Sequence, residues 1–494
     1  MNWKAAAAAV KWNIRPYIGG RYINSAATET FNNVNPATES VLCRVPIGSA
    51  ADVDAAVTVA QRRFNDGCWS ELPPARRVES LQRLADLILK HKADFALFDC
   101  LEMGKPIKAA LHEAEQLTVP YLRAWAGFAD KLFGASAPIH GDALSFNCYE
   151  PRGVVGAITA WNFPTLNTIY KLAPALAAGN TLVLKPSELS SASALKIAEL
   201  AVEAGIPEGV VNVVPGLGST VGLALAKHPD VDLISFTGST ATGRKIMEYA
   251  AQSNGKPVML ECGGKSPHVV FADAANLDMV ADEVVQLVVW NQGQVCAAHT
   301  RLIAHEKVKE SLVERVVERA CKYKPGDPLD ENTTFGPLAS PAQRSRVKSF
   351  IDRGLEAGAV AVLKGEIWSS GGCYVCPTVF DKVHAEMDIA REEIFGPVLT
   401  VQGFQTDEEA IALANGTDYG LAATAWTRDM ARAKRVARAI RAGCVMIRTS
   451  GTEGPESGCT LGFQPQKASG FGSETGLEGL KSYSALKLVI LTGT

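Results

Sequence analysis

The chain has 494 residues, of which 47% are hydrophobic and 20% charged, and its formal net charge is −3. That length is enough for about two to four domains of roughly 100–200 residues each, with a large core. The weak net charge excludes a strong basic field for nucleic acid or acidic membranes, so we expect neither partner and favour small-molecule chemistry.

The ends of the chain and its cysteines bear on location. The apolar run Ala5–Val10 ends at Lys11, too short for a secretory signal, and we see no apolar stretch of about 18 residues that would span a membrane. The 11 cysteines are odd in number and scattered, which predicts free thiols in the cytoplasm. Cys373 and Cys376 lack a second pair at zinc-site spacing, so no metal is expected.

The N-terminal part predicts a hairpin followed by helices. Two glycines interrupt the β-prone run Tyr17–Ile23, which is typical of a hairpin. Ser49 and Asp52 have the spacing of a capping box at a helix start. Apolar residues at helical spacing from Val78 to Ile88 predict a second, longer helix.

From Gly153 the sequence alternates between short apolar runs and helical patterns, which predicts a parallel, doubly wound sheet whose ligands bind beyond the carboxyl ends of its strands. The expected strands are Gly153–Ala160, Thr181–Leu184, Val210–Val214, Leu233–Phe236 and Val258–Glu261, and the expected helices are Ser191–Glu203, Ser219–Lys227 and Thr242–Gln252.

After Gly263 the alternation starts again and predicts a second α/β domain. Its expected elements are His268–Phe271, Asp278–Trp290, Arg301–His305 and Val308–Cys321. The apolar C-terminal run Lys481–Leu491 is β-prone. A lone terminal strand needs a sheet edge to pair with, which another subunit can provide.

Two segments are candidates for holding a phosphorylated cofactor. Phe236–Gly243 joins an apolar strand to a helix and carries a Gly-x4-Gly spacing, where free N–H groups at a helix start can hold a pyrophosphate. Lys185–Glu188 follows another strand and could hold ribose hydroxyls. A plain turn explains the first segment equally well, and a solvated loop explains the second.

Three further segments carry reactive side chains. Asn162 in Trp161–Pro164 can donate to an oxyanion, Cys296 in Asn291–Cys296 can act as a nucleophile, and Glu261 in Glu261–Gly264 can act as a general base. Taken singly, each has a structural explanation: a turn, one structural thiol among 11 cysteines, or a surface charge.

Together these segments resemble the aldehyde dehydrogenase superfamily, in its broad hydrolytic NAD(P)-dependent branch, from Tyr17 to Leu491. The matching segments are Asn35–Thr38, Trp161–Pro164, Leu184–Glu188, Phe236–Ser239, Leu260–Pro267, Asn291–Cys296 and Glu392–Pro397. Their order along most of the chain makes coincidence negligible.

The resemblance implies an α/β fold with a Rossmann-type cofactor domain (residues 1–130 and 153–263) and a catalytic domain (264–462). A β arm for oligomerisation (131–152 and 478–494) would pair with a neighbouring subunit and give a homodimer or a homotetramer.

The same resemblance implies the catalytic roles. Cys296 would attack the aldehyde, and Asn162 with the Cys296 backbone N–H would hold the oxyanion. Glu261 would activate the water that hydrolyses the thioester. Lys171 and Glu474 lie where the family places a proton relay for that glutamate.

For the cofactor, the resemblance assigns Lys185 and Glu188 to the adenosine ribose. The remaining cofactor residues that it implies are Trp161, Gly218, Gly238, Ser239, Glu393 and Phe395. A carboxylate at Glu188 would repel a 2′-phosphate, which favours NAD, although Lys185 could pair with that phosphate and NADP stays open.

The family's tunnel positions carry four aromatic side chains, Phe163, Tyr170, Trp290 and Phe463, which favour a hydrophobic or aromatic aldehyde over core packing alone. The chain departs from the family pattern at Gly462–Lys467, Arg448, Cys262 and His299. If Arg448 faces the tunnel, the substrate would instead be an anionic semialdehyde. The sequence is also compatible with a CoA-acylating enzyme and with a non-catalytic NAD-binding structural protein.

Overall fold

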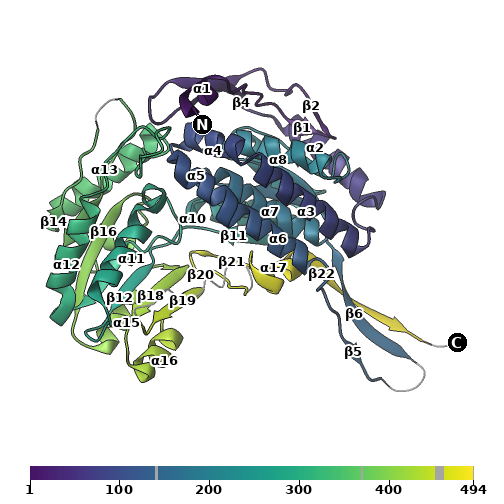
Figure 1. Ribbon diagram of the computed structural model, residues 1–494. Helices are drawn as coiled ribbons and strands as arrows, with labels where there is room; N and C mark the ends of the chain where they lie inside the picture. Colours follow the sequence, from purple (N-terminus) through teal and green to yellow (C-terminus); the bar gives the residue numbers. More distant parts are fainter. Residues whose placement is uncertain (140–142, 369–370, 451–460, 493–494) are drawn as a thin grey trace.

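The computed structural model describes residues 1–139, 143–368, 371–450 and 461–492. Two α/β lobes lie beside each other, and a narrow β arm projects away from them (Figure 1). The first lobe contains most of the N-terminal half, and the second contains the green segment from about residue 265 to 450.

The first lobe is built on an eight-stranded sheet with the order β2-β1-β9-β8-β7-β10-β11-β21. Its five central strands are parallel, while β1, β2 and β21 are antiparallel additions at the edges. The strands are β1 (Tyr17–Ile18), β2 (Arg21–Tyr22), β7 (Val154–Ile158), β8 (Thr181–Lys185), β9 (Val211–Val213), β10 (Leu233–Thr237), β11 (Val258–Glu261) and β21 (Gly470–Phe471).

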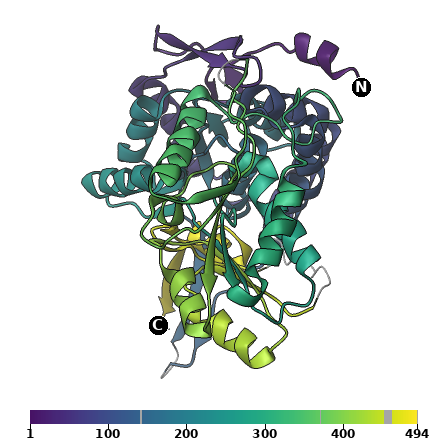
Figure 2. The same cartoon turned by 90° about the vertical axis from the view of Figure 1, so that its left-hand side faces the viewer.

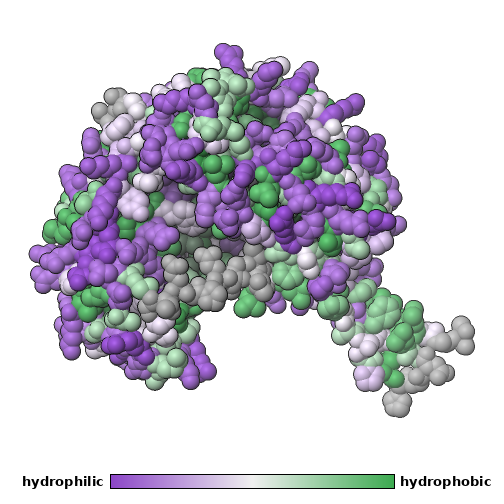
Figure 3. Space-filling view, in the orientation of Figure 1, coloured by the Kyte–Doolittle hydropathy of each residue, from purple (hydrophilic) through white to green (hydrophobic). Residues whose placement is uncertain are grey.

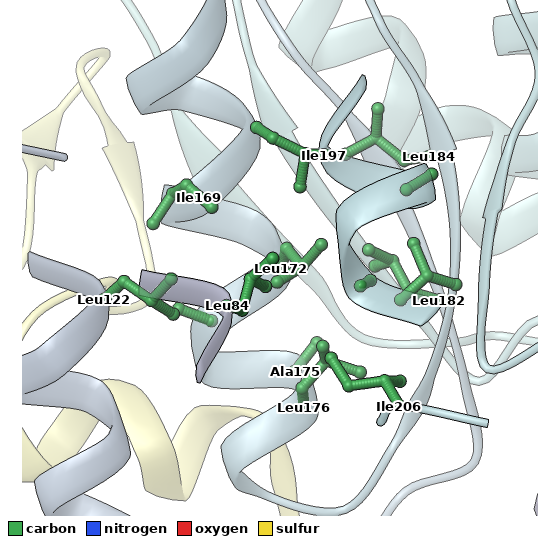
Figure 4. Close-up of a cluster of buried hydrophobic side chains, with 14 of the residues drawn as sticks. Leu84, Leu122, Ile169, Leu172, Ala175, Leu176, Leu182, Leu184, Ile197 and Ile206 are labelled. Carbon is green, nitrogen blue, oxygen red and sulfur yellow. The ribbon is translucent and has the colours of Figure 1, made fainter. Parts of the chain in front are cut away.

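Helices cover both faces of this sheet because its central strands are apolar on both sides. In β8, Leu182 and Leu184 face one core, and Val183 faces the other. Figure 4 shows the first of these cores, where the two leucines meet side chains of the helices over them. The helices of the lobe are α2 (Ala50–Asn65), α3 (Pro74–Lys90), α4 (Lys92–Met103), α5 (Ile107–Glu113), η1 (Ala114–Thr118), α6 (Val119–Phe128), α7 (Pro164–Ala177), α8 (Ala192–Glu203), η2 (Gly218–Gly222), α9 (Leu223–Lys227) and α10 (Thr240–Gln252).

The second lobe contains a seven-stranded sheet with the order β14-β15-β16-β13-β12-β18-β19, parallel except for β14. Its strands are β12 (Pro267–Val270), β13 (Arg301–His305), β14 (Val360–Leu363), β15 (Thr378–Asp381), β16 (Val398–Phe404), β18 (Ala422–Trp426) and β19 (Cys444–Arg448). Its helices are α11 (Leu277–Val289), η3 (Trp290–Gly293), α12 (Glu306–Ala320), α13 (Pro341–Glu356), α14 (Asp388–Arg391), α15 (Asp407–Asn415) and α16 (Met430–Ala439). Figure 2 views the molecule from the side of this lobe.

The arm is a separate three-stranded sheet of β5 (Ser136–Ala137), β6 (Leu144–Pro151) and β22 (Ser484–Leu491). The C-terminal strand pairs with β6 of the same chain over its full length. Figure 3 shows green, hydrophobic residues along the arm, which projects from a largely hydrophilic surface. The exposed apolar side chains of the arm are Leu144, Leu486, Leu488, Ile490 and Leu491.

The remaining elements are short: α1 (Trp3–Ala8), β3 (Thr30–Val34), β4 (Val41–Pro46), β17 (Tyr419–Gly420), β20 (Gln466–Lys467) and α17 (Gly476–Ser482). Within the described residues, no helix is both long and apolar enough to cross a membrane.

Most of the predicted elements are present, with two differences. The sequence pattern begins the C-terminal strand at Lys481, but this residue lies in helix α17, and the strand begins at Ser484. The helix expected over Ser219–Lys227 consists of a π-helical turn, η2, followed by one turn of α-helix. The capping box at Ser49 is confirmed, because Ser49 and Asp52 bond to each other's backbone N–H groups.

Candidate active site

A strained turn after helix α11 presents Cys296. Asn291 and Gln292 adopt left-handed conformations, with φ of 49° and 57°. At Gly293 a Cβ would lie 2.3 Å from the Gly396 backbone, and at Gly264 a Cβ would lie 2.1 Å from the Cys296 carbonyl oxygen. Only glycine fits such contacts, so these two glycines let the turn that carries Cys296 pack closely against the Gly396 backbone and against the segment that follows β11.

The Asn162 side chain is held against the same turn. Its amide Nδ2 donates to the Gln294 carbonyl at 2.9 Å, and its Oδ1 accepts from Asn167 Nδ2 at 3.1 Å. In return, Asn291 Nδ2 donates to the Asn162 carbonyl at 2.8 Å. An amide nitrogen carries two N–H donors, and the Gln294 carbonyl accepts from one of them.

The Cys296 thiol lies in an environment that disfavours the thiolate. Burial raises its pKa to about 12, and the nearby charges of Glu261 and Glu393 add to this effect. The resting thiol is therefore neutral at physiological pH. Attack on a carbonyl then requires that the thiol proton leave as the carbon–sulfur bond forms.

Glu261 stands at the end of strand β11. Burial raises the pKa of its carboxyl well above the ordinary value, the charge of Glu474 raises it further, and the Lys171 ammonium opposes them. A carboxylate with a raised pKa is a stronger base than an exposed one and is better matched to neutral pH.

Lys171 and Glu474 are brought together as a buried ion pair. The Glu474 carboxylate also accepts a hydrogen bond from Ser235 Oγ at 2.7 Å, and the Tyr483 hydroxyl donates to that serine at 2.9 Å. The chain Lys171–Glu474–Ser235–Tyr483 thus forms a buried polar network that reaches Glu261 electrostatically.

The sequence-based candidates do not include Ser235 and Tyr483. Ser235 is a fully buried serine between the apolar residues Ile234 and Phe236 of β10, and that buried polar residue is the one signal that could have pointed to it. Tyr483 lies 248 positions from Ser235, a distance that no spacing argument covers.

The predicted cofactor residues lie at the carboxyl edge of the first sheet. Lys185 ends β8 and its ammonium lies 3.0 Å from the Glu188 carboxylate. Ser239 caps the 13-residue helix α10, with Gly238 just before it, and Gly218 begins η2 with open space around its Cα. A dinucleotide fits this set, because the helix start can hold a pyrophosphate and the Lys–Glu pair can bond ribose hydroxyls.

Glu393 and Phe395 connect the two lobes near Cys296. Glu393 Oε1 accepts from the Gly264 N–H at 2.9 Å, and burial raises the pKa of its carboxyl to about 7. The Phe395 ring packs edge-on against Trp161, with centroids 5.3 Å apart. Trp161 and Gly264, which follow β7 and β11 of the first lobe, therefore contact Phe395 and Glu393 of the second lobe. The residues predicted for the nicotinamide side thus lie at the boundary between the two lobes.

Three of the four predicted substrate residues cluster beside the thiol. Phe163 packs with Val295 and the half-buried Tyr170, and its ring lies 5.2 Å from that of Trp290. Phe463 is half-buried near Gly443 and bonds through its backbone N–H to Thr475.

The unusual residues at family positions have partners of their own. Arg448 forms an ion pair with Glu283 at 3.1 Å, so its charge is already neutralised. His299 is buried with its Nε2 3.1 Å from the Thr424 hydroxyl, and Cys262 is buried in the first lobe. In the segment Gly462–Lys467, the Lys467 ammonium donates hydrogen bonds to the carbonyls of Asn415 and Thr417.

Comparison with known proteins gives a consistent result. Residues 22–489 match the model of the aldehyde dehydrogenase family. An aminoacetaldehyde dehydrogenase of Pseudomonas aeruginosa is 44% identical over 470 residues, covering 95% of this chain and 94% of that protein. The NADP/NAD-dependent aldehyde dehydrogenase PuuC of Escherichia coli is 40% identical over 488 residues, covering 99% and 97%.

Solved structures agree. The aldehyde dehydrogenase KauB from P. aeruginosa is 44% identical, with a TM-score of 0.95 over 99% of this chain and 98% of that one. An indole-3-acetaldehyde dehydrogenase in complex with NAD+ is 43% identical, with the same TM-score and the same coverage. The chain therefore belongs to the aldehyde dehydrogenase family, and its activity is the NAD(P)-dependent oxidation of an aldehyde.

Proposed function

We propose that this enzyme oxidises a hydrophobic or aromatic aldehyde to the carboxylic acid with NAD+, with Cys296 as the nucleophile. The observation that carries the proposal is the convergence at Cys296. The Asn162 amide is fixed 2.9 Å from the Gln294 carbonyl, two residues before the cysteine, and the carboxyl of Glu261 is close enough to raise the pKa of the Cys296 thiol.

In the first half of the reaction, the Cys296 sulfur bonds to the aldehyde carbon and gives a hemithioacetal. Because the thiol is neutral at rest, its proton leaves during this step. Glu261 is the proposed acceptor, because its pKa is raised and its charge acts more strongly on the thiol than that of Glu393. The Asn162 amide and the Cys296 backbone N–H would stabilise the oxygen of the intermediate; such a donor typically contributes about 2.7–4 kcal/mol.

The chemistry that bound NAD+ supplies is acceptance of the hydride from the former aldehyde carbon, which leaves a thioester on Cys296. Lys185, Glu188 and the start of helix α10 would hold the adenosine half of the cofactor, and Glu393 with Phe395 would hold the nicotinamide half. The carboxylate of Glu188 disfavours a 2′-phosphate, which supports NAD+ over NADP+.

Before the second half, Glu261 passes on the thiol proton that it accepted, and the buried network of Lys171, Glu474, Ser235 and Tyr483 would take up that proton. In the second half, Glu261 removes a proton from the water that attacks the thioester and returns it to the departing Cys296 sulfur, and the acid is released. The charges of Glu474 and Lys171 act on the Glu261 carboxyl, which supports a role for this network in setting the protonation of Glu261.

The substrate class rests on the aromatic wall beside the thiol. This wall consists of the aromatic side chains Phe163, Tyr170 and Trp290. Arg448, the cation that would favour an anionic semialdehyde, is paired with Glu283. Both observations favour an uncharged aldehyde with a flat or apolar group over a semialdehyde carboxylate.

We further propose that the enzyme works as a cytoplasmic homodimer or homotetramer. The exposed apolar residues of the arm support this, because apolar patches of this kind mark protein interfaces. The proposed domains are 1–130 with 153–263 for the cofactor and 264–462 for catalysis.

Purified protein is mixed with NAD+ and, separately, benzaldehyde, hexanal or succinic semialdehyde, and NADH formation is followed. We expect NADH from benzaldehyde or hexanal, loss of activity in Cys296→Ala, and near-normal activity in the matched control Cys376→Ala. Turnover that survives in Cys296→Ala would refute the nucleophile. A clear preference for succinic semialdehyde would refute the substrate class.

A further inference from the structure

A buried ammonium lies against the aromatic wall of the site. Lys105, between helices α4 and α5, is only 2% exposed. Its Nζ lies over the Phe163 ring, 4.2 Å from the ring centroid. An ammonium over a ring face is attracted by the ring's quadrupole, and the attraction is strongest where water is excluded.

Acidic groups on neighbouring helices fix the position of this ammonium. Lys105 forms an ion pair with the equally buried Glu113 of α5. The charge of Lys105 also acts on the buried Asp99 of α4. The Asp99 carboxylate in turn accepts a hydrogen bond at 2.9 Å from Thr165, two residues after Phe163. Lys105 is thus anchored to the same helix start that carries the ring.

The orientation of Phe163 bears directly on the space beside the thiol. Phe163 belongs to the same hydrophobic cluster as Val295, and Ala297 packs against this cluster; these two residues flank Cys296. The Phe163 ring also lies 5.2 Å from the Trp290 ring, at 53° between the ring planes. A rotation of the Phe163 ring would therefore change the shape of the wall next to the reacting sulfur.

We propose that Lys105 is a positioning residue that fixes the Phe163 ring and thereby sets the selectivity for aldehydes with flat aromatic groups. This inference rests on the proposed function, since it assumes that the aldehyde lies against Phe163. Lys105 itself touches neither the substrate nor the thiol, and acts only through the ring.

The test is a double-mutant cycle between the ion pair and the ring. Lys105→Met is made together with Glu113→Gln, so that no carboxylate is left buried without its cation. We expect kcat/KM for benzaldehyde to fall about tenfold, mainly through KM, and kcat/KM for hexanal to change less than about threefold. In a Phe163→Leu background, the same pair of changes should have no further effect.

Matched controls separate positioning from general damage. Lys92 and Glu115 form a more exposed ion pair on neighbouring turns, between α4 and η1, so Lys92→Met with Glu115→Gln should leave kcat/KM unchanged for both aldehydes. Lys105→Arg, which keeps a cation over the ring, should restore most of the benzaldehyde activity. If the neutral pair does not fold, Glu113→Gln alone should show a smaller loss in the same direction.

Two results would overturn the inference. One is a loss of unchanged size in the Phe163→Leu background, and the other is an equal loss for both aldehydes accompanied by weaker NAD+ binding. A wild-type enzyme that turns over hexanal but no aromatic aldehyde would refute the proposed substrate class instead. In that case the cycle, run with hexanal, would still decide whether Lys105 acts through Phe163.

Discussion

Lys171 and Glu474 form a buried ion pair, and replacing each residue separately should shift the pH dependence of thioester hydrolysis. The two shifts should have opposite directions. Lys171 lowers the pKa of Glu261, and the charge of Glu474 raises it. A base acts in its deprotonated form, so hydrolysis accelerates as the pH rises through that pKa. Lys171→Met should therefore shift the curve to higher pH, and Glu474→Gln should shift it to lower pH.

The magnitude follows from the placement of the charges. A single charge within about 4–6 Å of a carboxyl shifts its pKa by about 1–3 units. Lys171 and Glu474 are paired to each other, so each partly cancels the field of the other at Glu261. Each replacement removes one of these opposing contributions and leaves the other in place, so we expect shifts in opposite directions of about one pH unit each, equivalent to about 1.4 kcal/mol.

The assay follows NADH with a pre-steady-state burst, which separates the formation of the thioester from its hydrolysis. The steady-state rate after the burst is measured across the pH range for the wild type and both variants. Lys348→Met, which removes an exposed ion pair with Asp352, is the control and should leave the curve in place. Shifts in the same direction, or none in either variant, would refute the electrostatic coupling to Glu261.

Three further outcomes follow from the site. Asn162→Ala should reduce kcat about 10²–10³-fold with little change in NAD+ binding, measured by steady-state kinetics and titration; a loss below tenfold would remove this amide from the oxyanion site. Gly264→Ala places a Cβ 2.1 Å from the Cys296 carbonyl oxygen and should abolish activity, with a lower melting temperature by calorimetry; normal turnover would contradict the packing. Glu283→Gln frees Arg448 from its ion pair and should raise kcat/KM for succinic semialdehyde about tenfold relative to hexanal, whereas an unchanged ratio would mean that the arginine does not reach the substrate.

The fold was largely predictable because its signals are local. Each central strand of the first sheet is apolar on both faces, as in Thr181–Lys185, and such runs separated by helical patterns indicate a parallel sheet. The sequence pattern begins the C-terminal strand three residues early, because the residues that follow Lys481 are β-prone. Lys481 itself lies in helix α17. Its pairing partner, β6, lies far away in sequence, and no local pattern identifies it.

The site was predictable only in part. Motifs identify residues such as Cys296 and Glu261 that sit on a recognisable turn or strand end. They do not identify Ser235 and Tyr483, whose contact depends on how the terminal segment packs against β10. Motifs also do not reveal the partner of a charged residue. In the sequence, Arg448 suggests an anion site, but in the structure it pairs with Glu283, 165 positions away.

The family departures share a physical pattern that bears on substrate choice. Arg448 is neutralised by Glu283, His299 is bonded to Thr424, and Cys262 packs as a small hydrophobe. Each unusual side chain is thus accommodated within the protein, because a buried charge without a partner would cost stability. None of them offers an unpaired charge to a substrate. On the proposed function, selectivity then rests with the aromatic residues beside the thiol, and we predict that the orientation of Phe163, and hence the Lys105 charge over its ring, influences the choice of aldehyde.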